Sequence, residues 1–208
     1  MLVEKLLKIA LLGSSWVMWL MLALSVFSIA TMIERWIFFF RRRDDVEALG
    51  EDLISALESG DREKAGALLK ASKSVEAIVL GAAMRYLDKG PEAVADAIDS
   101  RMIRERRDLE RGSTLLGTLG NNAPFIGLFG TIIGVIIAFR QLGESQGGAS
   151  MQLVMGGIAE SLVATGVGLF VAIPAVVAFN IIQKSISDIE DNVASLSKEL
   201  TAFLKGQG

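Results

Sequence analysis

The sequence predicts an all-α integral membrane protein with three transmembrane helices and a helical cytoplasmic domain. Three stretches without a charged side chain predict the membrane helices: 25 residues in 9–33, 28 in 112–139 and 23 in 161–183. About 20 apolar residues are enough to cross the hydrocarbon core of a bilayer. The chain is 51% hydrophobic yet 22% charged, so apolar and charged residues must occupy separate regions.

We assign residues 1–40 to an external N-terminus and the first transmembrane helix. Lys5 and Lys8 precede the apolar stretch, as basic residues do in a signal peptide. The stretch is too long for a signal peptide and contains Trp16 and Trp19. We therefore expect a retained membrane helix rather than a cleaved leader.

The distribution of basic residues predicts the orientation in the membrane. Arg41, Arg42 and Arg43 follow the first span, against Lys5 and Lys8 before it. Because cationic flanks resist translocation, we expect the N-terminus in the periplasm and the C-terminus in the cytoplasm.

Residues 41–112 form the predicted cytoplasmic helical domain, which holds 14 of the 21 basic and 16 of the 24 acidic residues. Breaks at 59–61 and 90–91 divide it into amphipathic helices. After Pro91 no residue stops a helix before the membrane, so we predict one long helix that continues into the second span. The apolar positions at helical spacing are Val46, Leu49, Leu53, Leu57, Leu68, Leu69, Val75, Ile78, Val79 and Ala82.

The rest of the chain completes the predicted topology. Residues 113–140 form the second transmembrane helix, and 141–150 form a short periplasmic loop with one acid and no base. Residues 151–183 form the third transmembrane helix, and 184–208 extend it into the cytoplasm.

Glu160, Thr131 and Thr165 are the predicted proton-pathway residues. A carboxylate inside a span costs about 3 kcal/mol on insertion scales and faces a polar interior, where desolvation makes its protonated form accessible. Counting outward from the middle of the loop places Thr131 at the membrane level of Glu160. The alternatives are that Glu160 bonds to a neighbouring helix or lies near the outer surface, and that each threonine only satisfies its own helix carbonyl.

Small residues and prolines mark the second and third spans. Glycines spaced by three or four residues allow close helix packing in a bilayer, and prolines free backbone carbonyls that a neighbour or water must satisfy. The packing and motif residues are Pro124, Gly127, Gly130, Gly134, Gly168 and Pro174.

The composition excludes several classes of function. Without Cys or His, the chain has no disulfide, thiol chemistry or imidazole proton relay, and we expect no metal site and no cofactor. The net charge is −3 and the basic residues alternate with acids, so nucleic acid is not an expected partner. An intramembrane enzyme needs a nucleophile and a base at membrane depth, and we do not expect an enzyme.

Two segments resemble the paired signature of the ExbB/TolQ proton-channel family, which is related to the flagellar stator protein MotA. They are NAPFIGLFGTIIG at 122–134 and GIAESLVATGVGLFVAIPA at 157–175, and Asn180 follows them. The resemblance covers roughly residues 10 to 185. On it, Thr131 and Thr165 match polar pore residues, Glu160 matches the family's glutamate, and Pro124 and Pro174 match the motif prolines.

The resemblance implies a homo-oligomeric ring, a pentamer in this family, whose second and third helices line a pore. An ExbD/TolR-like single-span partner would lie in that pore, and its membrane Asp would carry the proton. The implied function is the proton-channel and stator subunit of a motor driven by the proton motive force in the bacterial inner membrane. The absence of an oxygen-rich cage within the spans favours H+ over Na+ as the ion.

The resemblance does not distinguish between three processes that such a motor could drive. They are import through a TonB-like protein, envelope constriction through a TolA-like protein, and gliding. The alternative function is a passive membrane scaffold that anchors envelope proteins in the lipid bilayer.

Overall fold

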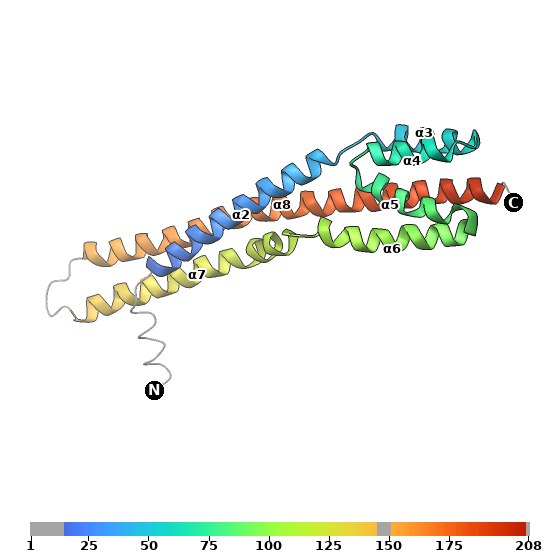
Figure 1. Cartoon of the computed structure of the whole chain (residues 1–208). Coiled ribbons are helices and arrows are strands. Elements are labelled where there is room, and N and C mark those ends of the chain that lie inside the picture. The colour runs from blue at the N-terminus through green and yellow to red at the C-terminus, as the bar shows by residue number, and fades with distance from the viewer. Residues whose placement is uncertain (1–14, 145–150, 207–208) are drawn as a thin grey trace. The chain divides into compact units, whose positions relative to one another are not determined.

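The computed structural model describes residues 15–144 and 151–206 of the chain, and every element within these residues is a helix (Figure 1). The predicted external residues before Ser15 and most of the predicted periplasmic loop lie outside the described residues. In chain order the helices are α2 (Ser15–Arg41), α3 (Val46–Glu58), α4 (Arg62–Ala71), α5 (Val75–Ala83), the 3-10 helix η1 (Met84–Lys89), α6 (Pro91–Leu109), α7 (Ser113–Glu144) and α8 (Met151–Gly206).

The chain divides into two compact units. The apolar unit comprises the chain up to Ile33 together with Gly112–Asn180. The charged unit comprises Glu34–Arg111 and the chain from Ile181 onward. Both α2 and α8 continue without a break from one unit into the other.

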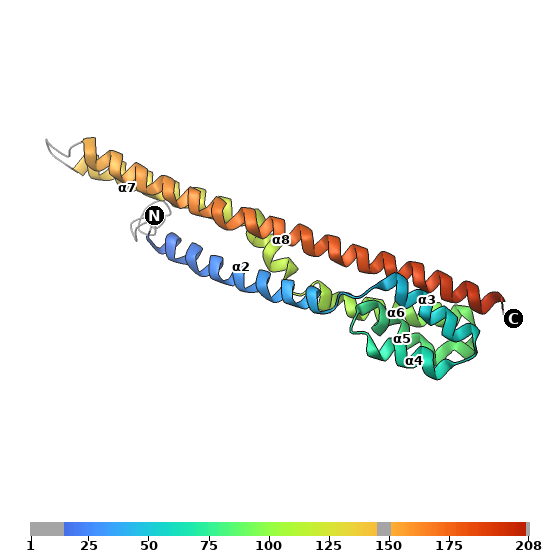
Figure 2. The same cartoon turned by 90° about the horizontal axis from the view of Figure 1, so that it is seen from above.

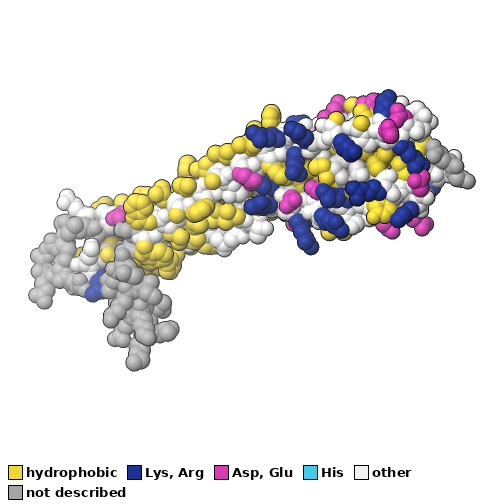
Figure 3. Space-filling model, in the orientation of Figure 1, with side chains coloured by type: hydrophobic (Ala, Val, Ile, Leu, Met, Phe, Trp, Pro, Cys, Tyr) yellow, Lys and Arg dark blue, Asp and Glu magenta, His cyan; other side chains and the backbone are white. Residues whose placement is uncertain are grey.

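Each of α2, α7 and α8 is long and apolar enough to cross a membrane, in agreement with the three uncharged stretches of the sequence. Hydrophobic side chains predominate over the visible surface of the apolar unit, whereas basic and acidic side chains are interspersed over the charged unit (Figure 3). An exposed apolar surface of this kind is typical of contact with lipid or with other membrane helices.

The apolar unit is a bundle of three helices with a small shared core. Views from two sides show α2, α7 and the first part of α8 alongside one another within this unit (Figures 1 and 2). Near the start of α2, the Trp16 ring packs edge to face on the Phe129 ring of α7. The ring centroids are 6.4 Å apart and the interplanar angle is 67°. The buried core residues are Val17, Met21, Ala123, Ile133, Val171 and Ala172.

Side-chain caps begin three helices of the charged unit. The Asp45 carboxylate accepts from the Ala48 amide at 3.2 Å at the start of α3. The Asp61 carboxylate and the Ser74 hydroxyl accept equivalent bonds at the starts of α4 and α5. Such caps satisfy backbone donors that have no partner within the helix. The predicted breaks at 59–61 and 90–91 are confirmed, because Gly60 and Gly90 adopt φ of 75° and 92° there.

Polar contacts connect α6 and α5 to the last part of α8 within the charged unit. The Arg106 guanidinium lies 3.0 Å from the Glu190 carboxylate. The Asn192 side-chain amide donates to the carboxylate of Glu76, a residue only 4% exposed, at 3.1 Å. These contacts fix α8 against the short helices, since a buried carboxylate needs a hydrogen-bond donor.

The prediction that the helix after Pro91 continues into the second span is wrong. Helix α6 ends at Leu109 and α7 begins at Ser113. Between them Gly112 adopts φ of 76°, a left-handed conformation that glycine adopts without steric cost. The charged residues of α6 and the apolar residues of α7 therefore belong to separate helices.

Candidate functional site

Helices α7 and α8 pack backbone against backbone at Gly127 and Gly168. A Cβ at Gly127 would lie 2.7 Å from the Ala164 carbonyl oxygen and 3.2 Å from the Gly168 Cα. A Cβ at Gly168 would lie 2.7 Å from the Ala123 carbonyl oxygen. Only glycine fits at both positions without a shift of backbone, which is how small residues bring membrane helices together.

The same contact continues through Gly130 and Gly134. A Cβ at Gly130 would lie 2.9 Å from the Ala164 Cβ and 3.2 Å from the Val17 Cγ1 of α2. Gly134 faces Ser161, whose Cβ lies 2.8 Å from the position a Cβ would take. The Ser161 side chain is 1% exposed and donates to the Gly157 carbonyl at 2.6 Å. Ser161 was not singled out from the sequence, although it is the small residue next to Glu160.

Thr131 of α7 and Thr165 of α8 meet across this contact, with their hydroxyls in a short hydrogen bond. Thr131 also donates to the Gly127 carbonyl at 3.1 Å. A hydroxyl carries one proton, so both bonds are made when Thr165 donates to Thr131. Both side chains are half-buried, and among the described residues no group donates to the Thr165 oxygen when it donates to Thr131.

Glu160 does not lie with the two threonines. The prediction that Thr131 and Glu160 share one membrane level is wrong, because the residue opposite Thr131 is Thr165. Five residues of helix separate Glu160 from Thr165, about 7.5 Å of rise and about 140° of rotation. The Glu160 side chain is exposed on α8 in the single chain, nearer than Thr165 to the connection between α7 and α8.

The two motif prolines lie inside α7 and α8 rather than at helix ends. Each removes one backbone hydrogen bond, because proline has no amide proton to donate four residues back. Pro124 therefore frees the carbonyl of Gly120, and Gly120 itself packs against α8, where a Cβ would lie 3.2 Å from the Val176 backbone nitrogen. Pro174 is exposed and frees the carbonyl of Phe170.

One further polar residue of the apolar unit was missed by the sequence reasoning. The Ser28 side chain on α2 is 2% exposed, and its hydroxyl has no hydrogen-bond partner among the described residues. A lone serine in an apolar stretch gives no signal that could have identified it. Over residues 15–144 and 151–206, no group of three or more carboxylates is placed to hold a metal ion.

The geometry supports a small set of chemical roles. Two hydroxyls in contact can donate to a carboxylate or accept from a carboxylic acid or water. Because they lie within an apolar bundle, a hydrogen bond there is stronger than in water. A path that handles protons needs groups of this kind, and Glu160 supplies a titratable group farther along the same helix.

Comparison with known proteins identifies relatives of this chain. The sequence profile of the MotA/TolQ/ExbB proton channel family matches residues 71–195. That region contains α7, most of α8, and the two threonines.

Individual relatives are similar to part of the chain. The Tol-Pal system protein TolQ of Haemophilus influenzae is 40% identical over 121 residues, which cover 56% of this chain and 53% of that protein. The biopolymer transport protein ExbB of Xanthomonas campestris is 41% identical over 112 residues, covering 54% and 44%. ExbB of Pseudomonas putida is 33% identical over 148 residues, covering 71% and 45%. The chain thus spans about half the length of the relatives it matches.

The close contact of α7 and α8 predicts a contrast between two glycines of α8. Gly168→Ala places a methyl group against the Ala123 carbonyl, whereas Gly166→Ala meets no atom within 4 Å. Both changes favour the helical conformation by about 1 kcal/mol. The difference between the unfolding free energies of the two variants therefore reports the contact at Gly168. We expect Gly168→Ala to lower the free energy of unfolding by about 1–3 kcal/mol relative to Gly166→Ala.

The measurement is helix content by circular dichroism during denaturant titration of the full chain in mixed micelles. Equal unfolding free energies for the two variants would show that α7 and α8 are not in backbone contact at Gly168.

Proposed function

The chain belongs to the MotA/TolQ/ExbB proton channel family, and from this membership we propose that it is the proton-channel subunit of an inner-membrane motor. The motor would be driven by the proton motive force and would transmit energy to the cell envelope together with an ExbD/TolR-like single-span partner. Each proton moved across the membrane releases about 2.3 kcal/mol per 100 mV of potential, which is the energy that the motor would use.

The hydroxyl pair of Thr131 and Thr165 is the observation that supports this proposal most strongly. A partner carboxylate brought to this depth would cost about 3 kcal/mol to ionise. One hydrogen bond to a charged acceptor returns about 1.5–3 kcal/mol. Reorienting Thr165 toward such a carboxylate would therefore offset most of the cost, and turning back toward Thr131 would favour the protonated acid. The pair would thus let one site accept and release a proton.

Glu160 would act as a separate step of the path. With the N-terminus in the periplasm, the connection between α7 and α8 is also periplasmic, and Glu160 lies nearer to it than the threonines do. The carboxylate would then receive protons from the periplasmic side and pass them through water toward the hydroxyl pair. In this topology the predicted domain 41–112 and the end of α8 from residue 184 lie in the cytoplasm.

The apolar surfaces of α7 and α8 support assembly into a homo-oligomeric ring. Phe125 is 68% exposed on α7, and Phe170 and Ile173 are 74% and 63% exposed on α8. Neighbouring copies and lipid would cover these side chains, and we propose a pentamer that surrounds the single span of the partner. A TonB-like or TolA-like protein would then take up the motion.

Removing the two hydroxyls tests the proposal. Thr131→Val with Thr165→Val keeps the shape of both side chains, and Thr131→Ser with Thr165→Ser keeps both hydroxyls. We expect the valine variant to lose proton flux by about tenfold to a hundredfold, because a hydrogen bond to a charged group is lost. The serine variant should keep most of the flux. Flux is measured with a pH-sensitive dye inside liposomes that contain the chain and its single-span partner.

Glu160→Gln gives a second, independent test, because it removes the titratable group and keeps the size of the side chain. We expect flux to fall by at least about tenfold, while native mass spectrometry still finds the same complex with the partner. Glu160→Asp is the matched control and should retain part of the flux. If both Glu160→Gln and the valine pair leave flux and envelope function unchanged, the chain is a passive scaffold.

A further inference from the structure

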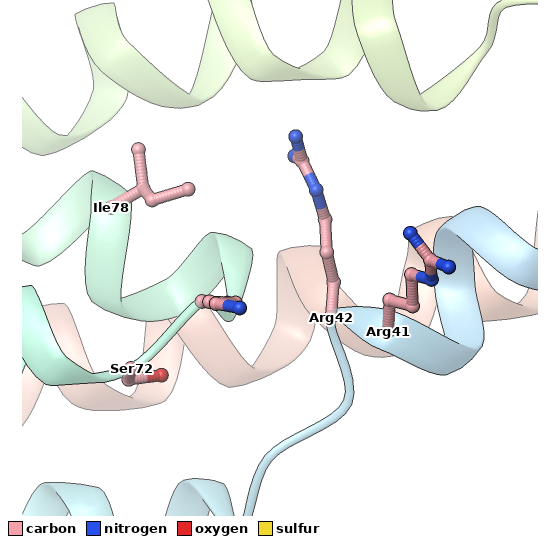
Figure 4. A pocket seen from close by; sticks show the side chains of 5 residues that line it. Arg41, Arg42, Ser72 and Ile78 are labelled. Atoms are coloured by element: carbon pink, nitrogen blue, oxygen red, sulfur yellow. The ribbon is translucent and has the colours of Figure 1, made fainter.

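A cavity of about 620 Å³ lies in the charged unit, at the C-terminal end of α2. It is lined by Arg41 at the end of α2 and Arg42 directly after it, by Ser72 and Lys73 between α4 and α5, and by Ile78 of α5. The arginine side chains extend from the end of α2, with Ser72 and Ile78 across the cavity from them (Figure 4). The lining thus combines three cationic side chains with one apolar wall.

The positive charge of this cavity is only partly compensated. Among the described residues, the side chains of Arg41 and Lys73 have no ion pair or hydrogen bond. The Arg42 Nη1 lies 3.8 Å from the Glu105 carboxylate, which is beyond hydrogen-bond distance. Glu105 is already bound by Arg101 at 2.7 Å. The cavity therefore has unpaired positive charge that favours an anion.

The hydrogen-bond donors in the cavity differ in whether they already have a partner. The Arg42 Nη1 is buried and has no hydrogen-bond partner in the described part of the chain, which costs about 1–3 kcal/mol for a buried donor. The Arg42 guanidinium is held in place by the Phe38 ring, whose centroid lies 4.3 Å away. The Ser72 hydroxyl donates to the Ser74 hydroxyl, so its proton is already used. Recognition of an anion therefore depends on the arginines and Lys73.

Large apolar side chains lie on α2 directly before the basic residues. Trp36 and Phe40 are 72% and 74% exposed, and Ile37 is 44% exposed. Aromatic side chains of this kind lie at the level of the lipid headgroups in membrane proteins. The apolar surface of a membrane helix thus ends where the basic cavity begins, within one helical turn.

We propose that this cavity binds the phosphate group of an anionic glycerophospholipid, with the acyl chains lying along Trp36, Ile37 and Phe40. A free phosphate or an acidic peptide would match the charge alone and would leave these apolar side chains uncovered. A lipid satisfies both parts, since basic pockets beside membrane helices bind anionic headgroups and guanidinium groups match phosphate oxygens. The proposal requires only that α2 spans the membrane and is independent of proton conduction.

The test is native mass spectrometry of the full chain in detergent, with phosphatidylglycerol or with phosphatidylcholine of the same acyl chains. Arg41→Gln with Lys73→Gln removes two cavity charges. Arg104→Gln with Arg107→Gln removes two exposed α6 charges and serves as the matched control. Circular dichroism verifies folding, and Lys73→Gln alone, outside every long helix, replaces the double variant if that variant misfolds.

We expect retained phosphatidylglycerol in preference to phosphatidylcholine, and an affinity about thirtyfold weaker in the cavity variant, or about fivefold weaker for Lys73→Gln alone. The control variant should bind as the natural chain does. Equal retention of both lipids, or an equal loss in the control, would overturn the proposal. Full displacement of the lipid by inorganic phosphate would also overturn it, because the site would then recognise a soluble anion.

Discussion

The backbone contact between α7 and α8 is the constraint on which the rest of the apolar unit depends. Lipid tails are as apolar as leucine, so membrane helices associate through close packing rather than through a hydrophobic drive. Glycines at 127 and 168 allow that packing, because a Cβ at either would lie 2.7 Å from a carbonyl oxygen of the other helix. This contact fixes both the separation of the helices and their register, and α2 adds Val17 and Met21 to the core that results.

The register determines which polar groups meet inside the bundle. Gly134 lies opposite Ser161, and a few residues deeper Thr131 lies opposite Thr165. Each of these serine and threonine hydroxyls except that of Thr165 donates to a carbonyl of its own helix, and Thr165 is the group that would reorient in the proposed path. Glu160, on another face of α8, stays apart from this pair. A hydroxyl pair and a separate carboxylate are what a stepwise proton path needs, whereas a purely structural bundle needs neither.

Much of the architecture followed from the sequence, and the failures have specific physical causes. Uncharged stretches predicted the three membrane helices, because bilayer thickness imposes their length. The segments around Gly60 and Gly90 predicted helix breaks. Gly112 did not predict one, because a single glycine inside a helical pattern costs a helix only about 1 kcal/mol. The predicted membrane level of Glu160 was wrong because counting residues from the loop ignores side-chain packing. That packing sets the register of α7 against α8. The basic cavity could not be predicted, since Arg41 and Lys73 meet only in the folded charged unit.

The register of α7 against α8 can be measured directly, because the chain has no natural cysteine. Pairs of cysteines at 131 and 165, or at 131 and 160, are introduced into the full chain in membranes and oxidised, and intramolecular disulfides are counted by mass spectrometry. Two cysteines must have Cα atoms within about 7 Å to form a disulfide. The structure predicts that Thr131→Cys with Thr165→Cys cross-links and that Thr131→Cys with Glu160→Cys does not. Preferential cross-linking of the second pair would contradict the hydroxyl pair and, with it, the proposed proton path.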